Sequence, residues 1–243
     1  MDSEIKGYIF DYGGTLDTGG QHWARVIWKA WQGHGMPVSE QQFREAYVFA
    51  ERTLDRSPIV LPTYTFKKLL DVKLRLQMEY LFTHRWWTAD KKEFTRVHLT
   101  ILEDLYADVR RHVAQSRLVL NELRERCPLV LVSNFYGNMG SVLFEMELDG
   151  LFSRVVESAA VGIRKPDPRL FQLAIDAFGQ AEAAAPSPSE IMVVGDSLRN
   201  DIAPARSLGC QTTWLKGEGW RDEPSDESLP THVITELQQL LKL

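Results

Sequence analysis

The sequence predicts an α/β fold: a doubly wound parallel sheet that carries a helical insertion after its first strand. Two observations predict it. Short, continuously apolar runs recur along the chain and alternate with helical patterns, whereas residues 20–113 show almost only helical patterns. Continuous apolar runs are typical of parallel strands that are buried on both faces, and strands that alternate with helices build doubly wound sheets.

The composition is that of an ordinary folded protein and argues against two kinds of partner. The chain has 243 residues, of which 44% are hydrophobic and 25% charged. This length suits one large domain, or a core domain with a smaller one. The net charge of -5 and the lack of a Lys and Arg cluster argue against nucleic acid. No segment approaches the roughly 20 apolar residues that span a bilayer, so no membrane partner is expected.

The cysteines and the first residues indicate a cytoplasmic protein. Cys127 and Cys210 lie far apart and form no CxxC pair, which argues against a disulfide framework or a zinc site and favours a reducing compartment. The first apolar run already ends at Asp11, which is unlike a signal peptide.

Three strong strand patterns end at polar residues. The run Gly7–Phe10 leads into Asp11 and a glycine pair, and the two others, at 129–132 and 191–194, lead into Ser133-Asn134 and Gly195-Asp196. An apolar run that ends in such residues is typical of a buried strand followed by a tight loop. Weaker strand patterns lie at 154–157, 211–215 and 232–234, and helical patterns lie at about 138–148, 168–180 and 200–208.

Residues 20–113 are expected to form a helical cap. The first apolar stripe runs from Trp23 to Trp31 and is closed by glycines, and Ser39 with Gln42 resembles a capping box for the next helix. Two more stripes begin at Phe66 and Phe94. We predict roughly four helices here, and hence a core domain of residues 1–19 and 114–243 with a cap domain of residues 20–113.

Four polar residues are candidates for chemistry at one crevice. Asp11, Ser133 and Asp196 follow or end strand patterns, and Lys165 lies in a loop. In an open parallel sheet the ligand crevice lies outside the carboxyl ends of the strands. Two neighbouring carboxylates repel each other unless a cation separates them, and oxygen ligands suit Mg²⁺. A hydroxyl and an ammonium can then hold a phosphate that touches the metal.

Each of these residues also has an ordinary structural explanation. An aspartate at a strand end often caps a turn, Gly-Asp-Ser is a common turn sequence, and a single lysine is usually solvated. Their joint occurrence favours a site. Asp17 is equally consistent with capping the start of the insertion and with a chemical role, and His22 is expected to be a surface or packing residue.

In order along the chain, these motifs resemble those of the haloacid dehalogenase-like hydrolases. The segment Asp11-Tyr12-Gly13-Gly14-Thr15-Leu16 resembles the start of the family's first motif, DxDGTLxD, although the closing aspartate would fall on Thr18 and Asp17 comes one place early. The second, third and fourth motifs would be Ser133, Lys165-Pro166-Asp167-Pro168, and Gly195-Asp196-Ser197 with Asp201. The long gap after the first motif suits the subclass with a helical cap inserted there.

The resemblance implies a role for each matching residue. Asp11 would be the nucleophile that forms an aspartyl-phosphate, and Asp11, Asp196 and the backbone carbonyl of Gly13 would bind Mg²⁺. Ser133 and Lys165 would hold the transferring phosphoryl group, and Asp201 would orient Lys165 or a metal-bound water. Further candidate substrate contacts are Tyr12, through its backbone N–H, Thr15 and Asn134.

One residue departs from the pattern of the family's phosphatases. They carry an acid/base aspartate two residues after the nucleophile, where this chain has Gly13. Such acid–base help is typically worth about 10²–10⁴-fold in rate. Dehalogenases also lack this aspartate, and Ser133-Asn134 resembles theirs, but they need no metal and lack the Gly-Asp-Ser motif. Phosphonoacetaldehyde hydrolases use a lysine early in the cap as an amine, and the early cap offers only Lys29, in a helix that we expect to be structural.

We therefore expect a Mg²⁺-dependent phosphohydrolase that acts on a small phosphorylated metabolite, with its acid/base group supplied from elsewhere, for example the cap. The alternative class is a regulatory protein that binds a phosphorylated ligand without turnover. A nucleophile at Asp11 favours the enzyme, because a binding protein needs none. Turnover of an activated aryl phosphate would distinguish the two classes. The sequence leaves the substrate and the oligomeric state open.

Overall fold

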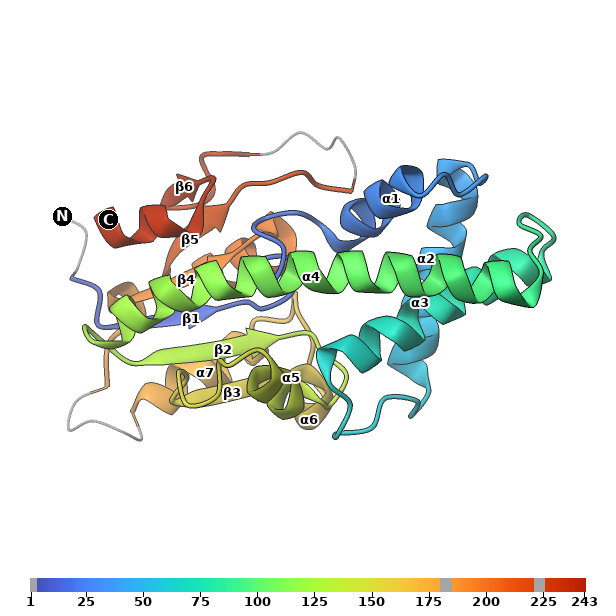
Figure 1. Cartoon of the computed structure of the whole chain (residues 1–243). Helices are drawn as coiled ribbons and strands as arrows, with labels where there is room; N and C mark the ends of the chain where they lie inside the picture. The colour runs from blue at the N-terminus through green and yellow to red at the C-terminus, as the bar shows by residue number, and fades with distance from the viewer. Residues whose placement is uncertain (1–3, 180–184, 221–225) are drawn as a thin grey trace.

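The computed structural model describes residues 4–179, 185–220 and 226–243, and it confirms the predicted fold class (Figure 1). All six expected strands form one parallel sheet, in the order β3-β2-β1-β4-β5-β6. The strands are β1 (Gly7–Phe10), β2 (Leu129–Ser133), β3 (Arg154–Glu157), β4 (Ile191–Gly195), β5 (Gln211–Leu215) and β6 (His232–Ile234).

The topology brings the ends of three strands together. The chain builds the sheet from β1 outward on one side through β2 and β3, and then on the other side through β4, β5 and β6. Phe10 is in register with Leu131 of β2 and with Val194 of β4. The residues that follow these three positions therefore meet at one edge, at the topological switch point where open α/β sheets bind ligands.

Both faces of the sheet are covered because every central strand is apolar on both sides. Successive side chains of a strand point to opposite faces. Tyr8 and Phe10 belong to one buried cluster, whereas Ile9 belongs to another that includes Phe171. The core helices are α5 (Met139–Glu145), α6 (Ser158–Val161), α7 (Arg169–Phe178) and α8 (Ala203–Ser207), with a π-helical turn, η2 (Leu198–Ile202), and short 3-10 turns at Pro188–Glu190 and Leu237–Lys242.

The three expected core helices form with shifted bounds. The patterns at about 138–148 and 168–180 correspond to α5 and α7, although residue 180 lies outside the described residues. The pattern at about 200–208 is divided between η2 and α8. Pro204 at the start of α8 has no N–H to donate, which is tolerated in the first turn of a helix.

The chain between β1 and β2 forms four helices and no strand: α1 (Trp23–Gly33), α2 (Glu40–Arg56), α3 (Phe66–Thr83) and α4 (Lys91–Arg124). Ser39 and Gln42 make the predicted capping box at the start of α2. Figure 1 shows α1, α2 and α3 gathered at one end of the molecule, away from both termini.

Helix α4 connects these helices to the sheet. It is a continuous helix of 34 residues. Its first part packs against α1 and α3, whereas Val119, Leu120 and Leu123 share a buried cluster with residues of β2 (Figure 1). The predicted boundary between cap and core, at residues 113 and 114, therefore falls within an unbroken helix. The division into a core (1–19 and 114–243) and a cap (20–113) stays a prediction.

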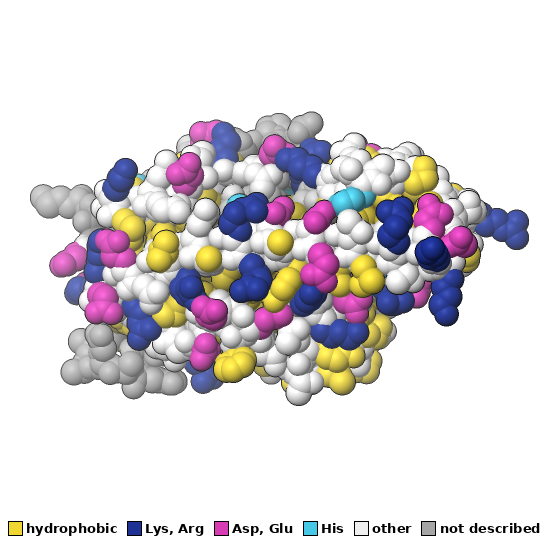
Figure 2. All heavy atoms as spheres, viewed as in Figure 1, with side chains coloured by type: hydrophobic (Ala, Val, Ile, Leu, Met, Phe, Trp, Pro, Cys, Tyr) yellow, Lys and Arg dark blue, Asp and Glu magenta, His cyan; other side chains and the backbone are white. Residues whose placement is uncertain are grey.

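Charges of both signs are interspersed on the face that Figure 2 shows, and Lys and Arg side chains do not gather into one patch there. Among the helices of the described residues, none is both long enough and apolar enough to cross a membrane. Cys127 and Cys210 are not joined by a disulfide. A cytoplasmic location stays a prediction.

Candidate active site

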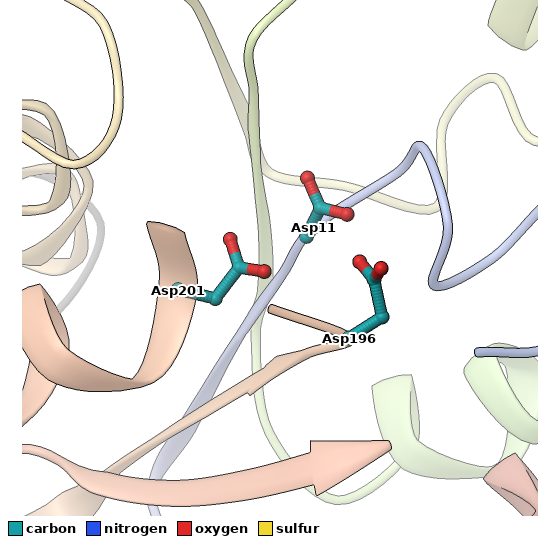
Figure 3. Close-up of side chains that lie close together, drawn as sticks. All are labelled: Asp11, Asp196 and Asp201. Atoms are coloured by element: carbon teal, nitrogen blue, oxygen red, sulfur yellow. The ribbon is translucent and has the colours of Figure 1, made fainter. Parts of the chain in front are cut away.

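Three carboxylates converge at the carboxyl edge of the sheet (Figure 3). Asp11 follows β1, Asp196 follows β4, and Asp201 projects from η2. Each offers an oxygen that lies within 4.8 Å of an oxygen of the other two. Asp11 and Asp201 are buried, and Asp196 is half-buried. The sequence predicted Asp11 and Asp196 as metal ligands, and the structure adds the Asp201 carboxylate to the same cluster.

Lys165 is held between two of these carboxylates. Its Nζ donates to Asp11 Oδ1 at 2.6 Å and to Asp201 Oδ1 at 2.7 Å. Burial of the ammonium works against its charge, but the two carboxylates outweigh this effect and raise the pKa of Lys165. Lys165 is therefore a positive charge beside the expected nucleophile. Its contact with Asp201 is compatible with one of the two roles expected of Asp201, that of orienting Lys165, and this role stays a prediction.

Asn134 fixes the backbone that carries Lys165. The Asn134 side chain accepts a hydrogen bond from the Lys165 N–H at 2.9 Å and donates one to the Lys165 carbonyl at 3.2 Å. This pair of bonds joins the loop after β2 to the loop before α7. Asn134 was predicted as a substrate contact, and in the structure its amide positions the lysine.

Thr15 connects the two expected metal-binding carboxylates. Its hydroxyl lies 3.0 Å from Asp11 Oδ2 and 3.3 Å from Asp196 Oδ1, and it accepts a hydrogen bond from the Asp196 N–H at 3.0 Å. The Tyr12 ring is fully buried, edge-on to Phe135 at a centroid distance of 5.8 Å, so this side chain belongs to the core. Ser133 is buried at the end of β2.

The electrostatics of the cluster fit a divalent cation. Burial raises the pKa of Asp11 to about 6, although Lys165 opposes the shift. Burial, followed by repulsion from Asp11 and Asp201, raises the pKa of Asp196 well above its usual value. Among the ion pairs of the described residues, none includes Asp196. Three carboxylates thus face one ammonium, and such a set of hard oxygen donors suits Mg²⁺.

The two glycines after Tyr12 differ in whether the structure would accommodate a side chain at their position. Gly14 has φ +100°, and a Cβ atom at this position would lie 2.5 Å from the Asp196 carboxyl. Gly13 has no positive φ, and a Cβ there would contact only Trp23, at 4.0 Å. The missing acid/base aspartate at position 13 therefore does not result from the backbone or from lack of space.

A cavity of about 270 Å³ extends from this cluster toward the helices α1, α2 and α3. Its lining includes Gly13 and Asp196 at one end and residues of the inserted helices at the other. His22, which the sequence placed at the surface or in packing, also lines it; its Nδ1 accepts a hydrogen bond from the Ala24 N–H at the start of α1.

Asp17 both caps the loop and lines this cavity. Its two oxygens accept hydrogen bonds from the Gly14 N–H at 2.7 Å and from Trp23 Nε1 at 3.0 Å. Burial raises the pKa of this carboxyl to about 7. The two roles that the sequence left open for Asp17 are therefore compatible.

Sequence reasoning missed six polar residues that line the cavity: Tyr47, Glu51, Lys73, Tyr136, Arg164 and Asn200. A signal was available for one of them, because Lys73 interrupts the apolar face of α3 between Leu70 and Leu74. Lys29, the amine that the sequence considered, is exposed, forms an ion pair with Glu218 and does not line this cavity.

The chain is similar in sequence to a known protein family and to several characterised enzymes. The family model described as haloacid dehalogenase-like hydrolase matches residues 5–209. A glyceraldehyde 3-phosphate phosphatase of Pyrococcus furiosus is 29% identical over 86% of this chain and 79% of its own length. A phosphoglycolate phosphatase of Aliivibrio fischeri is 28% identical over 99% and 97%. An (S)-2-haloacid dehalogenase of Pseudomonas fluorescens is 24% identical over 97% and 95%.

Solved structures share the fold at lower identity. A dehalogenase with an intermediate complex matches 98% of this chain and 96% of its own, at a TM-score of 0.61 and 17% identity. A putative HAD-hydrolase from Bacillus subtilis, bound to magnesium, matches 99% and 98%, at a TM-score of 0.56 and 17% identity. These likenesses concern the fold alone.

Proposed function

Because the chain belongs to the haloacid dehalogenase-like hydrolases, we propose that it is a Mg²⁺-dependent phosphohydrolase that cleaves a small phosphomonoester through Asp11. One observation carries the proposal: three carboxylates surround one point, and a buried lysine lies against the expected nucleophile. The phosphatases among its relatives support the same class.

The residues of the site have complementary roles in this proposal. A carboxylate oxygen of Asp11 attacks phosphorus, an Asp11–phosphorus bond forms, and the ester oxygen leaves with its electron pair. Water then attacks the aspartyl-phosphate, so that inorganic phosphate is released and Asp11 is regenerated. Lys165 stabilises negative charge on the phosphoryl oxygens, and Thr15 keeps the Asp11 and Asp196 carboxylates in place.

Asp11, Asp196 and the Gly13 carbonyl would hold Mg²⁺, and Asp201 belongs to the same group of carboxylates. Bound Mg²⁺ would neutralise the phosphoryl charge and polarise the bond to phosphorus. The cation would also reduce the electrostatic repulsion between Asp11 and Asp196. Lys165 cannot do this alone, because it bonds Asp11 and Asp201 but not Asp196.

The leaving group receives no proton from residue 13, because glycine has none to give. The rate of the first step should then depend strongly on how well the leaving oxygen carries negative charge. The small cavity, about 270 Å³, favours a substrate of few atoms.

Dehalogenation is the second candidate, because a relative and several structural neighbours carry that name. Removal of a halide needs a nucleophilic carboxylate but no second one to bind a cation. The Asp196 carboxylate, which has no ion-pair partner among the described residues, favours the phosphohydrolase. A protein that binds a phosphorylated ligand without turnover could use Lys165 but would need no nucleophilic carboxylate beside it.

Turnover of p-nitrophenyl phosphate tests the proposal. Wild type should release phosphate only when Mg²⁺ is present, and Asp11→Asn and Asp196→Asn should each lose at least ~100-fold in kcat/KM. Asp149→Asn, a change of the same kind at an exposed site, should match wild type. Halide release from a 2-haloacid without Mg²⁺, in place of phosphate release, would support the dehalogenase instead.

A further inference from the structure

The end of the cavity that faces the inserted helices carries a buried charge network. Lys73 of α3 is buried, and its Nζ lies 2.7 Å from Glu51 Oε1 of α2. The same Nζ donates to the Tyr136 hydroxyl at 3.2 Å, and that hydroxyl donates to Glu51 Oε2 at 2.6 Å. All three residues line the cavity. The network thus joins two inserted helices to the loop that follows β2.

Lys73 is an ammonium and keeps a free donor. Burial works against its charge, but Glu51 outweighs this effect and raises the pKa of Lys73. Lys73 is therefore not the neutral amine that a covalent imine would need. A lysine ammonium has three N–H donors, and the described residues offer acceptors for two, Glu51 and Tyr136. The third N–H can donate a hydrogen bond to a ligand oxygen.

Two cationic side chains, Lys73 and Arg164, line the cavity. The carboxylates that line it are Asp17, Glu51 and Asp196. Arg164 also forms an ion pair with Asp55, which does not line the cavity. Both carboxylate oxygens of Glu51 already have partners. The remaining N–H of the Lys73 ammonium can therefore donate a charge-assisted hydrogen bond to a ligand carboxylate.

Apolar side chains also line the cavity. The ring of Phe66, the side chains of Leu69 and Leu70, and Phe135 line the cavity together with both ends. A small ligand can thus place a phosphoryl group at Asp11 and a short carbon chain along these walls. The volume of about 270 Å³ leaves little room for a second phosphate or a base at the far end.

We propose that Lys73 binds a carboxylate at the far end of the substrate, so that the enzyme acts on phosphomonoesters of short hydroxy acids. The inference rests on the proposed function, since it deepens the substrate class of the same site. Lys73 is a specificity-determining residue in this proposal, and Glu51 and Tyr136 position it. A neutral alcohol or aldehyde at the far end would give the remaining N–H of Lys73 only an uncharged acceptor.

A matched pair of ligands tests the inference. 3-Phosphoglycerate and glycerol 3-phosphate differ only in that a carboxylate replaces a CH₂OH group. Calorimetry with Mg²⁺ and the Asp11→Asn variant measures binding without turnover. We expect the acid to bind at least ~10-fold more tightly than the alcohol, which corresponds to ~1.4 kcal/mol.

Two variants and a control locate the effect. Lys73→Met, combined with Asp11→Asn, should bring the affinity ratio close to ~1, but it leaves the buried Glu51 carboxylate unpaired, which can cost several kcal/mol of stability. Glu51→Gln combined with Lys73→Met removes both charges and should give the same loss in a folded protein. Lys68→Met is the matched control, because Lys68 is an exposed lysine of the same helix and does not line the cavity. It should keep the ratio.

The outcomes separate this inference from the proposed function. Equal binding of the two ligands, binding of neither, or a ratio that survives in the doubly neutral variant would each overturn the role of Lys73. Failure of the wild type to hydrolyse p-nitrophenyl phosphate would instead overturn the phosphohydrolase. A preference for the acid without any turnover would leave the carboxylate site in place in a protein that binds but does not hydrolyse.

Discussion

The carboxyl carbon of Asp196 lies 2.5 Å from the position that a Cβ atom would take at Gly14. The loop after β1 and the loop after β4 are therefore packed in direct contact, and the backbone of Gly14 also has a positive φ of +100°. Only glycine meets both conditions. The contact limits the positions that the Asp196 carboxylate can take relative to Asp11.

The first prediction follows from this contact. Gly14→Ala should displace the Asp196 carboxylate and strain the loop, at a cost of about 1–3 kcal/mol in stability. We expect Mg²⁺ affinity, measured by calorimetry, to fall at least ~10-fold.

Gly13→Ala is the matched comparison for this change. The new Cβ would contact only Trp23, at 4.0 Å, and no positive φ is needed. Its loss of Mg²⁺ affinity should be clearly smaller than that of Gly14→Ala. Equal losses in the two variants would mean that contact with Asp196 is not what requires glycine at position 14.

The second prediction concerns the two hydrogen bonds between Asn134 and the backbone of Lys165. Asn134→Ala leaves a backbone donor and an acceptor without these partners, which should cost about 1–3 kcal/mol, or roughly 2–12 °C in Tm. It should also lower kcat/KM for p-nitrophenyl phosphate at least ~10-fold, because Lys165 is no longer held against Asp11.

A double-mutant cycle shows whether Asn134 acts through the lysine. In a Lys165→Met background, Asn134→Ala should cause little further loss of activity, although it should still lower Tm. A full additional loss of activity would give Asn134 a direct role at the substrate, as the sequence first suggested.

The group of polar residues at the carboxyl edge of the sheet could be predicted because an apolar strand pattern ends at or just before each of them. The runs before Asp11, Ser133 and Asp196 are apolar throughout, so their order and approximate ends were readable, and parallel topology then brings those ends together. Lys165 could be predicted only from its motif, since nothing in a loop sequence reveals that its backbone bonds Asn134 from 31 residues away.

The far end of the cavity could not be predicted in this way. Glu51 and Lys73 lie in helices whose pattern reports which face is buried, but not which cavity that face lines. Their pairing depends on the packing of α2 against α3, which the sequence does not specify. Asp17 was ambiguous for a similar reason, because its bond to Trp23 requires the start of α1 to return to the loop.

The third prediction concerns pH. Burial raises the pKa of Asp17 to about 7 and that of Asp11 to about 6, from the usual 3.8 in the unfolded chain. The folded protein thus retains protons that the unfolded chain has lost, so these two groups make stability fall as pH rises from about 4 to about 7. Without Mg²⁺, Tm should fall more steeply over this interval in wild type than in Asp17→Asn.

Mg²⁺ should act in the opposite direction. Metal binding needs deprotonated ligands, so added Mg²⁺ should raise Tm more at pH 7.5 than at pH 5. Asp149→Asn, at an exposed site, should follow wild type in both buffers. A Tm slope that is the same in Asp17→Asn and wild type would show that the Asp17 carboxyl is not held protonated by the fold.

The last prediction concerns the missing acid at position 13. With Gly13 as the native residue, the leaving group departs without a proton from this position, so kcat for a series of phosphomonoesters should fall steeply as the pKa of the leaving alcohol rises. Aryl phosphates should be hydrolysed far faster than alkyl phosphates. Asp11→Asn should abolish both reactions, because an amide is a poor nucleophile.

Gly13→Asp should restore a proton donor, and the structure permits this side chain: the backbone at position 13 has no positive φ, and a Cβ has room beside Trp23. We expect turnover of alkyl phosphates to rise more than that of aryl phosphates, by up to ~10²-fold, and the leaving-group dependence to flatten. Gly13→Asn has nearly the same shape without an acidic proton, so it should not flatten the dependence. If wild type already hydrolyses alkyl phosphates as fast as aryl phosphates, another group donates the proton, and Asp17, which lines the same cavity, is the first residue to replace.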